Sequence, residues 1–299
     1  MNQLLAIRAF ARVVETGSFT RAADSLHMPK TSVSKLVDEL ETHLGVKLLT
    51  RTTRRVAVTS EGSMYYGQTE RLVRELEDID TSLAGSHKQP QGIVRVTLGS
   101  SLASCVVLPA LPAFLDRHPG IQVELDVTDR HVDLVAENVD CAIRGGRMTD
   151  ETVVARLLGM ASWRTCAAPG YLARFGEPTD PADLQARHRL VNYQSARTSR
   201  VLPASFEQSG ARFKLEGPAS VSVNESNANL AAGLAGLGVI QNFNYVVRPY
   251  LDSGALVEVL PDWRPPPYPI HVVYPPNRHM GHRIRVFIDW LAEEFARLA

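Results

Sequence analysis

The feature that most constrains the fold lies in the first 60 residues, where glycine and proline divide the chain into three short amphipathic segments. The first, over 3–14, stops at Gly17 and places apolar side chains at helical spacing, at Leu4, Leu5, Ile7, Ala11 and Val14. A second helix is predicted over 21–27, before Pro29 prevents its continuation. A third is predicted over about 31–44. The chain is therefore expected to begin with three short helices and tight connections.

The second and third predicted helices have the layout of a helix-turn-helix reader of DNA. The polar side of the third helix carries small hydroxyls and a lysine, and Ser18 or Thr20 can cap the second helix. A generic helical hairpin would show the same periodicity, so the next segment decides between the two. On the DNA-binding interpretation, the residues expected at base edges or phosphates are Ser18, Thr20, Lys30, Thr31, Ser32, Ser34 and Lys35.

The next segment predicts a basic β-hairpin. Two short apolar strands are expected over 46–49 and 56–58, and every residue between 50 and 55 is threonine or arginine. Guanidinium groups suit phosphates and the narrow minor groove, where the negative potential is strong. The hairpin therefore favours a winged helix-turn-helix, with wing contacts to DNA expected from Arg51, Thr53, Arg54 and Arg55.

The charge distribution favours a polyanionic partner although the whole chain is neutral. The sequence has 32 Lys and Arg residues and 32 Asp and Glu residues. Residues 1–59 hold nine of the basic residues and five of the acidic ones, whereas residues 60–87 hold two and six. Because the field that DNA meets is local to a Debye length, roughly 10 Å, a basic head can bind DNA on a neutral chain.

A long helix is predicted from Thr59 to about Ala84. Its apolar residues follow heptad spacing, at Tyr65, Leu72, Leu76, Ile79 and Leu83. Charged residues flank this stripe, so it is too narrow for a broad core and suits a second helix. Packing against its own domain is the alternative. The narrow stripe favours a homodimer that forms through this helix.

After a linker at 85–92, strand patterns alternate with helical ones. Strands are expected over 93–98, 121–127, 141–144, 164–168, 190–193, 220–223, 239–241 and 270–274. Helices are expected over 102–117, 131–138, 226–236 and 283–297. This alternation predicts an α/β domain with mostly parallel sheets. The fold class is thus α/β overall, with an all-α winged head and a long linker helix in front.

Polar residues follow several of these strands, at the edge where open α/β sheets bind ligands. Helix capping is the alternative use of serine and asparagine at such positions. Their convergence favours a small-molecule site, with Ser100, Ser101, Asp129, Arg144, Asn224 and Ser226 as its expected residues. Free N–H groups at helix N-termini, together with Arg144, favour a small carboxylate or a similar anion. No cofactor is expected.

Residues 15–62 resemble the amino-terminal signature of LysR-type transcriptional regulators. The matching elements are Gly17-Ser18-Phe19, Ala22-Ala23, Ser32-x-Ser34, Leu40-Glu41, Gly45-x-x-Leu48 and Arg51-Thr52-Thr53-Arg54-Arg55. Two positions depart from the pattern: the common Gln that begins the recognition helix is replaced by Lys30-Thr31, and the Phe before the wing by Leu49. The DNA target therefore does not transfer from a relative.

The later segments resemble the effector-binding domain of the same family, at 140–146, 169–172 and 232–239. The resemblance implies a winged helix-turn-helix domain over 1–59, a linker helix over 60–87, and a periplasmic-binding-protein-like domain over 88–299. Its two subdomains would be about 92–162 with 267–299, and about 163–266. It also implies a cytoplasmic bacterial regulator that binds double-stranded DNA and a small-molecule effector. The expected assembly is a homodimer or a dimer of dimers, with RNA polymerase as a partner if the protein is an activator.

Two rival functions are an enzyme with a DNA-binding head and an architectural DNA-bridging protein. The sequence has no G-x-S-x-G, P-loop, H-E-x-x-H or G-x-G-x-x-G motif, and its three cysteines are far apart. His271, His279 and His282 have no carboxylate at ligand spacing, which favours solvated side chains over a metal site. No apolar run reaches the length of a membrane span. We therefore expect no catalytic residues, no metal site and no membrane partner.

Overall fold

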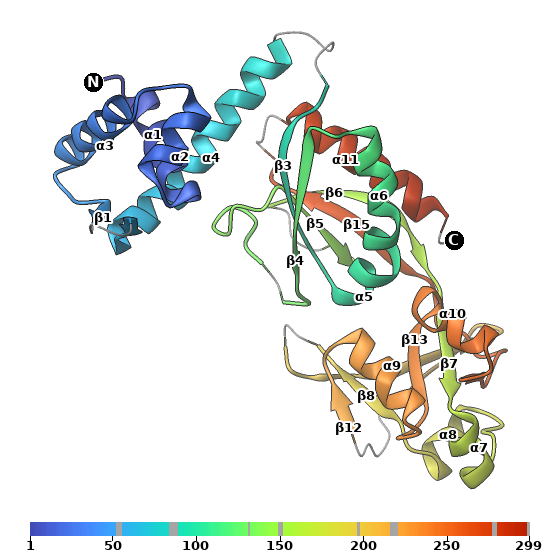
Figure 1. The fold of residues 1–299 in the computed structure, drawn as a ribbon. Coiled ribbons are helices and arrows are strands. Elements are labelled where there is room, and N and C mark those ends of the chain that lie inside the picture. Colours follow the sequence, from blue (N-terminus) through green and yellow to red (C-terminus); the bar gives the residue numbers. More distant parts are fainter. Residues whose placement is uncertain are drawn as a thin grey trace. The chain divides into compact units, whose positions relative to one another are not determined.

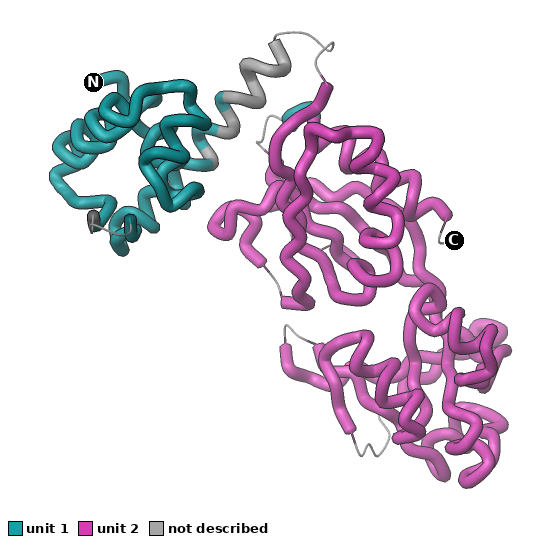
Figure 2. Tube along the Cα trace, in the orientation of Figure 1, with its two compact units in different colours: residues 1–88, 279–282 teal, residues 89–278, 283–299 magenta. Residues whose placement is uncertain are grey.

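The computed structural model describes residues 1–51, 56–83, 89–130, 132–148, 152–195, 198–215, 221–276 and 280–297. The chain divides into two compact units, residues 1–88 with 279–282 and residues 89–278 with 283–299 (Figure 2). The first unit carries helices and a small hairpin, and the second carries the larger sheets. No helix within the described ranges is long and apolar enough to cross a membrane.

The first unit consists of three helices, a two-stranded wing and the linker helix (Figure 1). Their bounds are α1 (Gln3–Thr16), α2 (Phe19–Leu26), α3 (Lys30–Leu44), β1 (Leu49–Arg51), β2 (Val56–Val58) and α4 (Ser60–Leu83). Gly17 and Gly45 end α1 and α3 in the left-handed region, at φ of +61° and +71°. The first wing strand begins at Leu49 and not at 46, because the Val46 N–H bonds back to the Glu41 carbonyl at 3.2 Å.

Of the α1 stripe that the sequence predicted, Ala11 is buried and Ile7 and Val14 pack against the core, but the centre of the core lies on neighbouring residues. Leu4 is 37% exposed, whereas Ala6, Ala9, Phe10 and Val13 are fully buried. Small side chains on α1 and α2 allow these helices to approach closely. The remaining fully buried members come from α2, α3 and the start of the wing: Ala22, Val33, Val37, Leu40 and Leu48.

The linker helix α4 packs partly on its own head through Tyr65, one of the residues predicted for the dimer stripe. The Tyr65 ring lies 6.0 Å from the Phe10 ring and, half-buried, packs against the core of the head. Leu72 is 57% exposed, Leu76 is half-buried and Val73 is buried. The side chains of Ile79 and Leu83 fall outside the described residues. Within the described residues, the apolar heptad stripe of α4 is thus accessible to a second helix only after the first turns of this helix.

The larger sheet of the second unit has five strands in the order β4-β3-β5-β15-β6. They are β3 (Gly92–Leu98), β4 (Ile121–Val127), β5 (Cys141–Gly145), β6 (Val154–Ala161) and β15 (Tyr268–Tyr274). β3 is parallel to β4 and β5, but β15 is antiparallel to β5 and β6. The expectation of mostly parallel sheets is therefore wrong here. The chain leaves this sheet after β6, a strand that was not predicted, and returns through β15 in the opposite direction.

The residues between β6 and β15 form smaller sheets, with orders β13-β7-β14, β12-β8-β9 and β10-β11. The strands are β7 (Trp163–Ala167), β8 (Val191–Gln194), β9 (Val201–Leu202), β10 (Ala204–Gln208), β11 (Ala211–Leu215), β12 (Val221–Val223), β13 (Ile240–Phe243) and β14 (Val257–Glu258). The helices are α7 (Pro169–Phe175), α8 (Pro181–Arg187), α9 (Ser226–Leu234) and α10 (Asn244–Asp252). β7 is antiparallel to both of its neighbours, and β10 is antiparallel to β11. Only the sheet around β8 is mixed, because β8 is parallel to β12 and antiparallel to β9.

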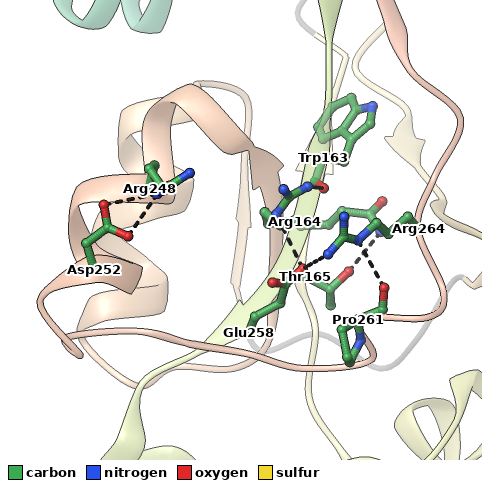
Figure 3. A network of polar contacts seen from close by, with 9 residues as sticks. Trp163, Arg164, Thr165, Arg248, Asp252, Glu258, Pro261 and Arg264 are labelled. Carbon is green, nitrogen blue, oxygen red and sulfur yellow. Dashed lines mark hydrogen bonds and ion pairs between the residues drawn. The ribbon is translucent and has the colours of Figure 1, made fainter. Parts of the chain in front are cut away.

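An ion-pair network fixes the end of β14 beside β7 (Figure 3). Glu258 lies between Arg164 of β7 and Arg264, with N···O distances of 3.3 Å to each. The Arg264 Nε also donates to the Pro261 carbonyl at 3.0 Å. Because Arg164 and Glu258 are largely shielded from water, this network holds the returning chain to β7 more firmly than exposed pairs would.

Two predicted helices differ from the observed structure. The helix expected over 102–117 begins earlier and has a π-helical middle: α5 (Ser100–Leu102), η1 (Ala103–Val107) and α6 (Leu108–Arg117). No helix forms over the described part of 131–138. There the Asp133 carboxylate accepts hydrogen bonds from the Val135 and Ala136 N–H groups, at 2.9 and 3.0 Å, which favours turns. The last predicted helix is α11 (His282–Ala296).

A buried histidine should make the part of the chain around α7 and α8 sensitive to acid. His188 is 3% exposed, and burial lowers its pKa although Asp183 opposes this shift. A lowered pKa stabilises the fold above the ordinary histidine pKa, about 6.5, and this stability is lost as the pH falls. We expect urea unfolding, followed by tryptophan fluorescence, to weaken between pH 8 and 5.5 by at most about 1.4 kcal/mol per pH unit from this group.

The matched variant is His188→Phe, which keeps an aromatic ring beside Tyr171, 6.0 Å from the histidine ring. It should lose less stability than the wild-type protein over the same pH range. Equal losses in the two proteins would show that His188 does not set this pH dependence.

Candidate DNA-binding surface and effector site

The polar face of α3 carries most of the predicted DNA-reading residues. Lys30, Thr31 and Lys35 are exposed, and Ser32 and Ser34 are half-buried on the same helix. On α2, Thr20 is exposed, while the Ser18 hydroxyl caps the helix by accepting the Arg21 N–H at 3.4 Å. Since Val33 and Val37 are fully buried on the other side of α3, its two faces are clearly separated.

The base of the wing is bonded to both neighbouring helices, an arrangement that the sequence analysis did not predict. From α3, the buried Glu41 carboxylate accepts the N–H groups of Leu48 and Leu49, at 2.9 and 3.0 Å. From the start of α4, the Thr59 hydroxyl donates to the Lys47 carbonyl at 2.7 Å. Only the Leu-Glu element of the sequence signature hinted at a role for Glu41. The predicted wing contacts Thr53, Arg54 and Arg55, and the Arg51 side chain, lie outside the described residues.

In the second unit, four of the six predicted effector residues come together at the start of α5. Ser100 donates a hydrogen bond to the Glu225 carboxylate, and the Ser101 and Tyr245 hydroxyls are 3.2 Å apart. Asp129 lies so close to Gly99 that a Cβ at that glycine would approach its Oδ1 to 2.4 Å. Arg144 is near enough to interact electrostatically with Asp129.

The charges of this site are only partly compensated. Burial raises the pKa of Asp129, the Glu225 carboxylate raises it further, and Arg144 opposes both. Burial lowers the pKa of Arg144, although Asp129 and other carboxylates oppose this shift. Among the described residues, nothing accepts a hydrogen bond from the buried Arg144 Nη2. The site therefore contains two carboxylates and one guanidinium whose buried Nη2 has no acceptor among the described residues.

The other two predicted effector residues, Asn224 and Ser226, are placed differently. Asn224 is exposed, and the buried Ser226 hydroxyl donates to the Asn242 Oδ1 at 2.9 Å. The cap of α9 is Glu225, whose carboxylate accepts the N–H groups of Asn227 and Ala228 at 2.7 and 2.8 Å. Contrary to expectation, these N–H groups of α9 are thus not free for an anion, because a carboxylate of the protein already holds them.

Aromatic residues that the sequence analysis missed complete the site. Burial raises the pKa values of Tyr193, Tyr245 and Tyr268. The Tyr268 ring covers the Gly145-Gly146 turn, where a Cβ at Gly145 would lie 2.4 Å from its Cε1. Gly145 and Gly146, which follow Arg144, must therefore be glycine, because a larger residue would collide with the Tyr268 ring. The sequence alone does not distinguish these tyrosines from tyrosines of the core. They belong to segments far apart in the chain, and only the fold brings them together.

The described residues include no group of three His, Cys, Asp or Glu residues that could hold a metal ion. Burial raises the pKa of Cys166 to about 12, so that its thiol stays protonated and unreactive.

Two family models cover nearly the whole chain. The LysR substrate binding domain matches residues 87–296, and the bacterial regulatory helix-turn-helix protein, lysR family, matches residues 4–63. The HTH-type transcriptional regulator YhjC of Escherichia coli is 40% identical over 296 residues, covering 98% of this chain and 97% of that protein. An HTH-type transcriptional repressor of Pseudomonas aeruginosa is 37% identical, covering 99% of this chain and 93% of that protein.

A solved structure has the same overall fold. CrgA, a LysR-type transcriptional regulator from Neisseria meningitidis, is 30% identical, with a TM-score of 0.62, and the match covers 97% of this chain and 98% of that one. The fold, the sequence signature and the relatives agree, and the relatives are all named as transcriptional regulators. The chain therefore belongs to the LysR family of DNA-binding transcriptional regulators, with an effector-binding substrate domain after its helix-turn-helix, and is not an enzyme.

Proposed function

We propose that this regulator reads double-stranded DNA with the polar face of α3 and holds the phosphates with the wing. The observation that carries the proposal is the exposed face of α3, opposite its buried valines. Thr31, Ser32, Ser34 and Lys35 would meet base edges or nearby phosphates in the major groove. The wing contacts would come from Arg51, Thr53, Arg54 and Arg55. The domain bounds of this proposal are 1–59, 60–87 and 88–299.

The proposed assembly is a homodimer joined along α4, with a dimer of dimers as the larger form. The exposed Leu72 and the heptad spacing of its neighbours support this pairing. Two tethered heads bind two half-sites with a raised effective concentration. A cytoplasmic location, and RNA polymerase as a partner if the protein activates transcription, belong to the same proposal.

The proposed effector is a small polar molecule held by Ser100, Ser101, Asp129 and Arg144. Its carboxylate or similar acceptor would bind the free nitrogen of Arg144. Because Asp129 and Glu225 also face this site, a second group that donates hydrogen bonds is required. By linkage, effector binding and DNA binding must then change each other's affinity by the same factor.

Two substitutions distinguish base readout from phosphate contact. Arg54→Ala should weaken binding to all duplexes and lower the slope of log affinity against log salt by about one. Thr31→Ala should weaken binding to the operator selectively, by about 1–3 kcal/mol, if it meets a base edge. Fluorescence anisotropy on the operator and on a scrambled duplex, over a range of salt concentrations, measures both. If the two variants weakened all DNA alike, the assignment of Thr31 to base readout would be wrong.

Genome-wide footprinting of the purified protein at physiological salt supplies the operator for these measurements. Discrete palindromic sites would support the proposed dimer. Uniform, salt-sensitive coating without preferred sites would contradict sequence-specific readout and favour an architectural role.

A further inference from the structure

The peptide groups around Leu48 join three elements of the head: α3, the wing and α4. The Leu48 side chain is fully buried in the core of the head. The Leu48 N–H is bound by Glu41 of α3. The Leu48 carbonyl accepts from the Thr59 N–H at 3.0 Å and from the Thr59 hydroxyl at 3.1 Å. Both polar groups of one residue at the foot of the wing are therefore held, one by α3 and the other by Thr59, which directly precedes α4.

The Glu41 carboxylate is held as an anion at this point. Burial alone would raise its pKa, but the Lys47 ammonium at 2.6 Å and the N–H groups of Leu49 and Leu48 outweigh that effect and lower the pKa. The Glu41 side chain is only 3% exposed, whereas the Lys47 side chain is 75% exposed. A buried carboxylate that already accepts three hydrogen bonds has no role as a direct DNA contact, and its charge would repel phosphates. Its action on DNA binding must pass through the groups that it holds.

We infer that Glu41 is a positioning residue for DNA binding, which fixes the wing in register with the recognition helix α3 through the Leu48 and Leu49 N–H groups. Leu49 is the first residue of β1, and the strand pairing Leu49↔Val58 and Arg51↔Val56 carries this register along the described wing. Thr59 extends the connection to α4, because its hydroxyl also accepts the Gly62 N–H at 2.9 Å. Recognition helix, wing and linker helix thus share one rigid joint. The inference rests on the proposed contact of the wing with DNA phosphates.

The test uses the full-length protein and a duplex of random sequence, about 30 base pairs long, because phosphate contacts need no operator. Two variants grade the loss: Glu41→Gln keeps an acceptor oxygen without the charge, and Glu41→Ala removes the acceptor. Glu41→Gln should weaken binding about threefold and Glu41→Ala about tenfold, with the salt slope falling by up to about one. Glu15→Gln, a surface carboxylate on α1 of the same head, is the matched control and should leave affinity and slope unchanged.

Hydrogen exchange gives a readout that does not involve DNA. The Leu48 and Leu49 amides should exchange faster in Glu41→Gln, while the amides of α1 and α3 keep their protection. If Glu41→Ala unfolds the head, Glu41→Gln alone decides the outcome. A folded Glu41→Gln protein with the wild-type salt slope and wild-type exchange at these two amides would overturn the inference.

The variant Arg54→Ala distinguishes a failure of the positioning role of Glu41 from a failure of the proposed contact between the wing and DNA. When Arg54→Ala lowers the salt slope but Glu41→Gln does not, the wing contacts DNA and only the positioning role is refuted. When both lower the slope and the double variant binds no more weakly than the weaker single variant, the two residues act through the same wing, as inferred. An unchanged slope in Arg54→Ala would refute the proposed Arg54 contact with phosphates, and the inference with it.

Discussion

Gly62→Ala should abolish DNA binding, because the methyl group would collide with the foot of the wing. A Cβ at Gly62 would lie 2.1 Å from the Leu48 carbonyl oxygen and 2.9 Å from a methyl of Val58. The first of these atoms belongs to the backbone, so α4 or the wing must move. Overpacking of this kind costs up to about 3 kcal/mol, and it also removes the hydrogen bonds that Thr59 makes to the wing.

Gly67→Ala is the matched control in the same helix. No atom lies within 4 Å of the position that its Cβ would take, and replacing glycine inside a helix stabilises it by about 0.5–1 kcal/mol. Hydrogen exchange of α1 and α3 is the appropriate measure of stability, since all three tryptophans, Trp163, Trp263 and Trp290, lie in the second unit. Wild-type affinity for a duplex in Gly62→Ala would show that the wing does not need this close contact.

The head was largely predictable from sequence because single residues near each boundary determine where its helices begin and end. Gly17 and Gly45 cap the observed helices α1 and α3, whereas α2 ends at the left-handed His27 and Pro29 stands at the N-cap of α3. The buried face of α1 was not predictable in the same way. Alanine and leucine are both compatible with a helix, and only the packing of α1 against α2, α3 and α4 selects the small residues Ala6 and Ala9 for the core.

The effector site was predictable only where a residue follows a strand or begins a helix. Ser100, Asp129 and Arg144 carry that local signal. Tyr245 and Tyr268 do not, because their place in the site depends on the return of the chain through β15 and on pairing between segments more than a hundred residues apart. Glu225 does begin a helix, α9, but its contact with Ser100 joins segments 125 residues apart. Strand β6 was missed for a different reason. Its residues do not alternate between apolar and polar, since Arg156 is the only polar side chain in Val154–Ala161.

Gly99→Ala should weaken effector binding without destabilising the second unit. The Gly99 φ of −67° suits alanine, so the backbone is not strained. Its Cβ would meet the Asp129 Oδ1 at 2.4 Å, and the carboxylate is the movable end of a side chain. Asp129 must therefore turn away from its place beside Arg144 and Glu225. Losing one charge-assisted hydrogen bond, worth about 1.5–3 kcal/mol, weakens binding about ten- to a hundredfold.

The probe for this measurement is the compound, from a panel of small metabolites, that most raises the melting temperature of the wild-type protein. Calorimetric titration of that compound into wild type, Gly99→Ala and Gly170→Ala gives the comparison. Gly170 lies in α7 with no atom within 4 Å of a Cβ, so its variant should bind like wild type. Because Gly99→Ala leaves the fold intact, a lost titration with an unchanged melting temperature of the free protein reports the site itself. Full affinity in Gly99→Ala would instead remove Asp129 from the effector site.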